Sequence, residues 1–430
     1  MTTHISRRTL LGLVGAGAGV HLLGACGDGD SDDPAGTQSI DWWHIQNTDP
    51  MKPVWAAMAQ EYQTAHAGVT VDIQPLENEA FKTKLTTATQ SGNPPDLFQS
   101  WGGGVLRQQV DAGLVKDLTA DVQPWIGGLL PAAMQPFTID GKIYGVPFDV
   151  GMVGFWYNKD LFSRAGITAA PTSWAGVLDA VRKLKAAGTV PIALAGKEKW
   201  PVHYYWAYLA MRIGGLGALQ QAAKDNNFDT PDFVAAGDRL KELVDLQPFQ
   251  KGFLGADYSS PDGQAATMGN GGAAMELMGQ WAPSVQQSSS TSKKGLGDKL
   301  GFFPFPAIDG GKGTATEAFG GGNGFAVGKD APAATIDFLK SLLTVENQGR
   351  AAKTGAVLPT LKEAASAIAD VNNKTVAQNL AGATGFQLYL DQAYPPAVGQ
   401  QVNDSVAELI AGNKTPAQIV KDITAVAKSQ

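Results

Sequence analysis

The chain is poor in cysteine, histidine and basic residues, and each scarcity argues against a class of function. Its one cysteine, Cys26, allows no disulfide within the chain. None of its five histidines, at positions 4, 21, 44, 66 and 203, has a second His or Cys at a metal-ligand spacing. Lys and Arg total 33 against 40 Asp and Glu, a net charge of −7 that leaves no basic surface for phosphates. We therefore expect no metal site and no nucleic-acid partner.

Motifs for covalent or nucleotide chemistry are also missing. The chain has no Gly-x-Ser-x-Gly turn and no Walker loop. A GAGAG run at 15–19 mimics part of a dinucleotide fingerprint but follows no strand, so we expect no cofactor. Two acids, Asp149 and Glu276, could serve glycoside hydrolysis. A secreted glycoside hydrolase therefore remains open as an alternative.

The first 37 residues read as an export signal followed by a tether. Arg7 and Arg8 precede a short apolar stretch and small residues that end at Cys26, which predicts a signal peptide at 1–25. The paired arginines point to the Tat route, and the Leu-Leu-Gly-Ala-Cys end resembles a lipobox, whose cysteine carries the lipid. Residues 26–37 are small and acidic, as in a flexible tether. We expect a protein lipid-anchored through Cys26 on the outer face of the cell membrane; the alternative is an ordinary signal peptide and an incidental or buried thiol.

Strands and helices alternate along the rest of the chain. Apolar runs predict strands at 39–45, 69–76 and 96–100, and helical spacing predicts helices between and after them. This alternation is typical of a parallel sheet. A second series follows, with strands at 190–195, 273–278, 300–306 and 324–327, an exposed loop at 284–299 and helices from 360 to the end. At 430 residues, the chain suits two α/β lobes.

The stretch Val146–Phe162 lies between these series and reads as a buried strand that bends. Gly151 and Gly154 interrupt its apolar run, and we assign them as hinge residues between the lobes. Two further crossings are predicted at 302–306 and 355–359. The expected boundaries are 38–148 with 307–353 for one lobe, and 149–306 with 354–430 for the other.

Aromatic and amide side chains gather in the loops that follow the predicted strands. Ligands of α/β lobes meet this end of the sheet, and a sugar needs flat aromatic faces surrounded by polar groups. We therefore predict stacking by Trp43, Trp101 and Trp281. The other candidates for ligand contact are His44, Asn47, Glu77, Ser100, Gly102, Asp149, Trp200, Tyr204, Tyr205, Gln280, Gly321, Gly322 and Asn323.

Several segments, in order, resemble one known family. They are PPDLF (94–98), YNKDLF (157–162), the helix 171–188, GGAAMELMGQW (271–281), FGGGNGFAV (319–327), the helix 333–343 and GAVLPTLKEA (355–364). Together they resemble the extracellular solute-binding proteins of ABC importers, family 1. In this comparison Trp281 matches the stacking aromatic of the family, and Glu77, Trp101 and Asn323 match binding positions. WWHIQNT (42–48) and SWGGG (100–104) look most like actinobacterial binders of xylobiose or related β-linked sugars.

The resemblance implies a fold, a ligand and partners. The expected fold is two-lobed and similar to maltose-binding protein (type II), with two mixed sheets flanked by helices and three crossings. The expected ligand is an oligosaccharide, the expected partners are an ABC permease and its ATPase, and the expected state is a monomer. A third possibility is a binder of another solute, such as a polyol or glycerol phosphate. The predicted loops hold almost no Arg or Lys for a phosphate, which argues against the latter.

Overall fold

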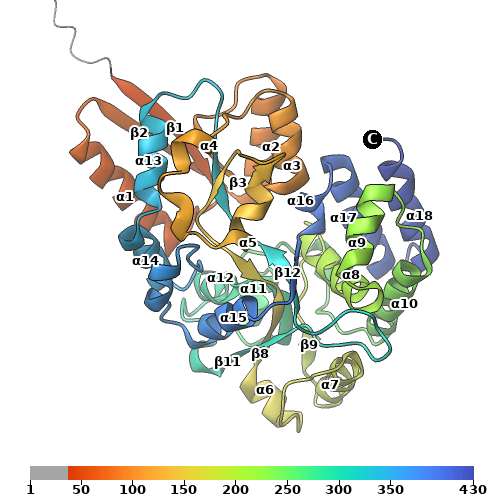
Figure 1. Ribbon diagram of the computed structural model, residues 1–430. Coiled ribbons are helices and arrows are strands. Elements are labelled where there is room, and N and C mark those ends of the chain that lie inside the picture. Colours follow the sequence, from red (N-terminus) through yellow and green to blue (C-terminus); the bar gives the residue numbers. More distant parts are fainter. Residues whose placement is uncertain (1–36) are drawn as a thin grey trace, which may run out of the picture. The chain divides into compact units, whose positions relative to one another are not determined.

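The structure, a computed structural model, describes residues 37–430 (Figure 1). The predicted signal peptide, nearly all of the tether and Cys26 lie outside these residues. Within them the strands form four sheets. No helix in the described part of the chain is long and apolar enough to cross a membrane.

The first sheet has the strand order β2-β1-β3-β13-β6. Its strands are β1 (Gln38–His44), β2 (Val69–Pro75), β3 (Leu97–Ser100), β6 (Val146–Pro147) and β13 (Gly324–Val327). β1 pairs in parallel with β2 and with β3, as the alternation of strands and helices predicts. β13 runs antiparallel to β3 and β6. The sheet is therefore mixed, and we call it, with its helices, the first lobe.

Helices pack on both faces of the first sheet because successive side chains of β1 point to opposite faces. Trp42 packs on one face with the helices α1 and α13, and Trp43 packs on the other with α2 and α3. Glu77 caps α2, its carboxylate accepting hydrogen bonds from the backbone N–H groups of Glu79 and Ala80 at 2.9 and 3.2 Å. The helices of this lobe are α1 (Met51–Ala65), α2 (Asn78–Gln90), α3 (Gly103–Asp111), α4 (Thr119–Val122), α5 (Pro131–Met134), α13 (Ala334–Leu342) and α14 (Val345–Lys353).

The second sheet has the order β11-β8-β10-β9 and forms the second lobe with its helices. Its strands are β8 (Gly154–Asn158), β9 (Val190–Ile192), β10 (Ala273–Met278) and β11 (Leu300–Pro304). β8 pairs antiparallel with β10 and β11, whereas β9 and β10 are parallel. Its helices are α6 (Lys159–Arg164), α7 (Trp174–Ala186), α8 (Trp200–Gly214), α9 (Leu216–Asp225), α10 (Pro231–Asp245), α11 (Gln264–Gly269), α12 (Ala282–Ser289), α15 (Val371–Ala381), α16 (Leu390–Ala393), α17 (Pro396–Ile410) and α18 (Pro416–Ala427).

A third sheet lies on the chain's path between the two lobes. It consists of β7 (Gly151–Met152), β12 (Glu317–Gly321) and β14 (Gly385–Leu388), with β12 in the centre (Figure 1). The first crossing runs from β6 through β7 to β8, and the second from β11 through β12 to β13. The third connects α14 to α15. Leu358 packs in the core of the second lobe, but Leu361 and Ala364 pack in that of the first, so the chain leaves the first lobe only after Ala364, later than the boundary predicted at residue 354. The fourth sheet is a hairpin of β4 (Thr138–Ile139) and β5 (Lys142–Ile143).

The sequence placed the second crossing wrongly. The predicted segment, 302–306, begins inside β11, the edge strand of the second sheet, and the chain returns to the first lobe only through 317–324. The boundary predicted at residue 306 therefore precedes the crossing. β12 and β14 escaped prediction because they are short, and β12 ends in consecutive glycines, which weaken a strand pattern. The predicted loop at 284–299 is also partly wrong, since its first residues belong to α12.

The two predicted hinge glycines have different surroundings. Gly154 lies inside the second sheet opposite Met278 and Pro304. A Cβ there would come within 2.4 Å of the Phe302 ring. Packing in the second lobe therefore requires glycine at position 154, and the structure gives its predicted hinge role no support. Gly151 lies in β7 on the first crossing, opposite Gly321, where a hinge role stays a prediction.

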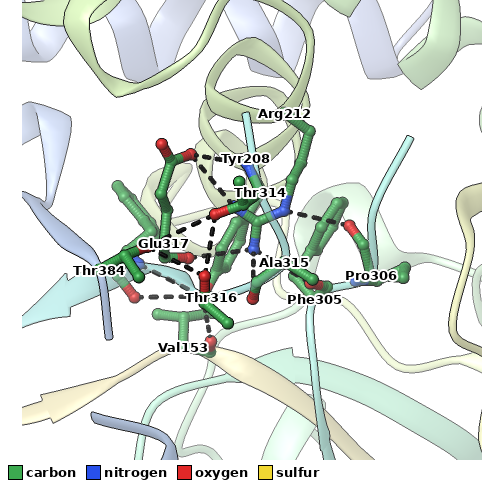
Figure 2. Close-up of polar contacts among 11 residues, drawn as sticks. Val153, Tyr208, Arg212, Phe305, Pro306, Thr314, Ala315, Thr316, Glu317 and Thr384 are labelled. Atoms are coloured by element: carbon green, nitrogen blue, oxygen red, sulfur yellow. Dashed lines mark hydrogen bonds and ion pairs between the residues drawn. The ribbon is translucent and has the colours of Figure 1, made fainter. Parts of the chain in front are cut away.

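A buried arginine fixes the approach to the second crossing. Arg212, at the end of α8, is fully buried. Its guanidinium donates hydrogen bonds to the backbone carbonyls of Phe305, Pro306 and Glu317 at 3.1 Å and to that of Ala315 at 3.4 Å (Figure 2). The Glu317 carboxylate lies 3.9 Å from the guanidinium. The cation thus holds both ends of the connection between β11 and β12.

Replacing Arg212 by Met should destabilise the protein strongly. The substitution leaves buried carbonyls without donors, so we expect a loss of about 3 kcal/mol or more in the free energy of unfolding. Urea denaturation followed by circular dichroism measures this loss. Arg182, exposed on α7, is the matched control, and Arg182→Met should change stability by about 0.5 kcal/mol or less. Equal effects of the two substitutions would contradict the role given to Arg212.

Candidate functional site

A cavity of about 970 Å³ is bordered by both lobes and by all three crossings. The first lobe contributes residues 45–52, Glu77, Asn78, Lys82 and Trp101. The crossings contribute Asp149, residues 321–323, Ala356 and Val357. The second lobe contributes the remaining lining residues, from the start of α8, the segment 258–261, the loop after β10, α12, Lys293 and the segment 389–392. Its volume lies in the range of small-molecule sites, and we call it the cleft.

Aromatic side chains of the second lobe form one wall of the cleft. Trp200 lies next to Tyr204, Tyr258 and Trp281, with ring centroids 5.7, 5.3 and 6.5 Å away. Tyr389 stacks on Tyr204 at 5.5 Å and lies 6.3 Å from Trp281. The first lobe contributes one aromatic ring, Trp101, with the Lys82 ammonium 5.8 Å from its centre. The wall thus offers several flat apolar faces to one space.

A buried carboxylate, that of Asp149, receives hydrogen bonds from several segments that border the cleft. The side-chain amides of Gln280 and Asn323 donate to one of its oxygens at 2.7 and 2.8 Å. The backbone N–H of Leu358 donates to the other at 2.8 Å. Gln99 extends this network by donating to the Asn323 carbonyl oxygen at 2.9 Å and accepting from the Ile45 backbone at 3.2 Å. We call these groups the Asp149 network.

Burial raises the pKa of Asp149 to about 7, against the opposing effect of its three hydrogen-bond donors. Other lining residues hold buried polar atoms that lack a partner within residues 37–430: Gln46 Oε1, Trp200 Nε1, Gln280 Oε1 and Tyr389 Oη. Such groups are costly unless they form hydrogen bonds. The cleft therefore combines apolar faces with unused donors and acceptors, which suits a polar ligand with apolar faces.

Most of the predicted ligand-contact residues line the cleft. They are Asn47, Glu77, Trp101, Asp149, Trp200, Tyr204, Gln280, Trp281, Gly321, Gly322 and Asn323. They come from separate strand ends, and the fold brings them to one space. Their contact with a ligand stays a prediction.

Trp43 and His44 do not line the cleft, and their predicted ligand contact is not supported. Trp43 packs on the face of β1 that α2 and α3 cover, where its indole N–H donates to Asp41 at 2.7 Å and the Lys84 ammonium lies 3.9 Å from its ring centre. His44 is buried against Trp42, at 4.7 Å between ring centroids. Burial lowers the pKa of His44 to about 3, so the imidazole is neutral. Both side chains belong to the interior of the first lobe.

Ser100, Gly102 and Tyr205 also lie away from the lining. The Ser100 hydroxyl accepts a hydrogen bond from the Gly102 backbone at 3.0 Å and so shapes the turn into α3. A Cβ on Gly102 would lie 2.5 Å from the Pro136 carbonyl oxygen, and its φ of +75° also favours glycine. Tyr205 follows Tyr204 on α8 but faces the core, near Phe155 and Phe249. Their roles in this structure are local.

Several lining residues escaped the sequence analysis. Tyr389, Asp391 and Gln392 follow β14, a strand that was not predicted, and Tyr258 lies in a loop that follows no strand. Their strand-end position could have been found only by recognising β14. Lys52 on α1, Lys82 on α2 and Lys293 after α12 also line the cleft, so the scarcity of cations in the predicted loops does not extend to the whole lining.

Glu276, the second acid of the hydrolase alternative, lies outside the cleft. It is fully buried in β10 and accepts hydrogen bonds from Gln264 and Gln286 at 2.9 and 2.6 Å. Asp149 and Glu276 therefore do not form a catalytic pair facing one ligand. Among residues 37–430, no group of three or more His, Cys, Asp and Glu side chains is arranged to hold a metal ion.

The titration of Asp149 should appear in the pH dependence of stability. Between the ordinary pKa of 3.8 and the folded value of about 7, the folded chain binds more protons than the unfolded one. The contribution of this carboxyl to stability therefore falls as pH rises through that range. Denaturation at several pH values measures the free energy of unfolding of the wild type and of Asp149→Asn. The value for the wild type should fall relative to that for Asp149→Asn as the pH rises from about 4 to about 7. Glu198 and Glu276, whose pKa values burial also raises to about 7, titrate in both proteins. A difference that stays constant with pH would contradict this assignment.

Comparison with known proteins agrees with this geometry. An uncharacterized ABC transporter extracellular-binding protein of Pyrococcus horikoshii is 28% identical over 302 residues, which span 65% of this chain and 65% of that protein. A solved structure from work on xylan utilization by Caldanaerobius polysaccharolyticus has 28% identity and a TM-score of 0.83, covering 90% of this chain and 99% of that one. A chitin oligosaccharide binding protein has the same identity and TM-score, with 91% and 98% covered.

These structural similarities confirm the predicted two-lobed α/β fold. The family model of the bacterial extracellular solute-binding proteins matches residues 46–349, more than half of the chain. The chain therefore belongs to the bacterial extracellular solute-binding protein family.

Proposed function

We propose that this protein is the extracellular substrate-binding subunit of an ABC importer and binds an oligosaccharide in the cleft. The observation that carries the proposal is that the aromatic wall and the Asp149 network border one cleft. A pyranose ring has an apolar face, which Trp200, Trp281 and Tyr389 can cover, and a rim of hydroxyls, which needs both donors and acceptors. The buried unpartnered atoms of Gln280 and Tyr389 supply an acceptor and a hydroxyl on that side of the cleft. Binding alone accounts for these features.

Within this class, we propose a β-linked ligand, with xylobiose or a longer xylo-oligosaccharide as the first candidate. The sequence resemblance at 42–48 and 100–104 supports it, as do the xylan-related and chitin-oligosaccharide-binding structures among the similar proteins. Stacked aromatic faces suit the flat, extended form of such sugars. The ligand is delivered to a permease and its ATPase, and the protein acts as a monomer.

A solute with an anionic group is the second candidate. Lys52, Lys82 and Lys293 in the lining favour it, because an ammonium is a good partner for phosphate. Glycerol phosphate therefore belongs in the ligand screen. A glycoside hydrolase is less well supported because Glu276 lies outside the cleft. Release of product from a chromogenic glycoside would support that alternative.

Titration calorimetry against xylobiose, xylotriose, cellobiose, maltose and N-acetylglucosamine oligomers tests the proposal. At least one saccharide should bind, and Trp281→Ala should weaken it tenfold or more, about 1.4 kcal/mol, since a stacking face is lost. Trp125→Ala is the control, because Trp125 lies in the first lobe outside the cleft. If no saccharide binds while glycerol phosphate does, the sugar proposal fails.

We also propose that the protein is exported by the Tat route and anchored through a lipid on Cys26. Cys26→Ser should move the protein from the membrane fraction to the medium, because the substitution removes the lipid attachment site. Fractionation and immunoblotting measure the shift, and Arg7→Lys with Arg8→Lys should separately block export. Retention of Cys26→Ser protein in the membrane fraction would contradict the anchor.

A further inference from the structure

The two lobes meet backbone to backbone at a pair of glycines. Gly103 and Gly104 begin α3 in the first lobe. A Cβ on Gly103 would lie 2.4 Å from the Gln392 carbonyl oxygen, and one on Gly104 would lie 2.4 Å from the Tyr394 carbonyl oxygen and 2.9 Å from the Pro395 nitrogen. Only residues without a side chain allow this approach. We call the two residues the glycine notch.

The segment that enters the notch also lines the cleft. Tyr389, Asp391 and Gln392 all belong to the lining. Tyr389 is 5% exposed, and its hydroxyl has no partner among the described residues. Gln392 thus lines the cleft and also places its backbone carbonyl against the first lobe, and Tyr394 and Pro395, which meet Gly104, follow it directly in the chain. A ligand that fixes these side chains also fixes the backbone that the notch receives.

Each partner in this contact is anchored to its own lobe. Leu106 of α3 is buried in the core of the first lobe. Leu390 of α16 is buried in the core of the second, and the side-chain amide of Asn403 on α17 donates to the Asp391 carboxylate at 3.4 Å. Any rotation of one lobe against the other therefore has to separate α16 from the notch.

We propose that docking of α16 into the glycine notch is the contact that stabilises the closed arrangement of the lobes, and that a ligand in the cleft strengthens it through Tyr389, Asp391 and Gln392. The notch itself is independent of the ligand's identity, whereas the coupling to a ligand rests on the proposed function. A side chain at position 104 should then favour the open arrangement.

Gly104 is the position that tests this contact. Gly104 does not have a positive φ, whereas Gly103 has a φ of +66°. Alanine can therefore adopt the backbone conformation of Gly104 without strain. Alanine also favours a helix over glycine, so α3 tolerates it. Gly127, also in the first lobe, is the matched control, because a Cβ there meets nothing within 4 Å.

The distance between the lobes can be measured by single-molecule energy transfer. Dyes on Thr86→Cys and Lys224→Cys, both exposed and in different lobes, report it in the full chain with Cys26→Ser. Without ligand, Gly104→Ala should shift the distribution to longer distances, and Gly127→Ala should leave it unchanged. With the saccharide that binds the parent protein, Gly104→Ala should bind at least tenfold more weakly, and its ligand-free melting temperature should not fall.

Two results would overturn the proposal. A lower melting temperature with an unchanged distance distribution would identify the contact as permanent packing. An unchanged distance distribution with unchanged affinity would show that closure does not use the notch. If no solute binds the parent protein, the proposed function fails. The ligand-free comparison of Gly104→Ala with Gly127→Ala still tests whether the notch contact stabilises the closed arrangement.

Discussion

Segments from all three crossings between the lobes meet at one carboxylate. Asp149 lies on the first crossing, Asn323 follows β12 on the second, and Leu358 lies on the third; the last two donate to Asp149 at 2.8 Å each. Gln280 joins them from the second lobe at 2.7 Å. An uncompensated buried charge costs several kcal/mol, so these donors hold the crossings in a fixed relation. Because the same carboxyl lines the cleft, the binding site and the connection between the lobes share this residue and its hydrogen bonds.

Helix α8 connects this region with the body of the second lobe. Its first turns present Trp200 and Tyr204 to the cleft, and its last turn presents Arg212 to the carbonyls before and after the connection from β11 to β12. β12 in turn ends at Gly321, in the lining. One helix thus sets the positions of both the aromatic wall and the second crossing.

The sequence predicts those features that depend on local patterns. β10 and β13 have the expected bounds because each is a largely apolar run next to glycines, interrupted in β10 only by Glu276. The strand-end loops bring Trp101, Trp281 and Asn323 to the cleft, as expected. Which side chains reach the cleft is harder to predict. On α8, Tyr204 lines the cleft and the adjacent Tyr205 faces the core, and Trp43 on β1 stays in the interior of the first lobe. The hydrogen bonds of Asp149 join residues more than 100 positions apart, which no local pattern reveals.

The glycines illustrate the same limit and explain how the cleft is built. In sequence, Gly151 and Gly154 look alike, yet a Cβ on Gly151 would lie 1.9 Å from Gln280, and one on Gly154 would meet the interior of the second sheet. A Cβ on Gly322 would lie 2.0 Å from the Asp149 carbonyl oxygen. Neither Gly151 nor Gly322 has a positive φ, so close approach, rather than backbone conformation, requires glycine there. Gly322 and Gly104 both lie against backbone atoms, so the first and second crossings, and the two lobes, approach one another through their backbones at these points. The side chains of the cleft remain free to face a ligand.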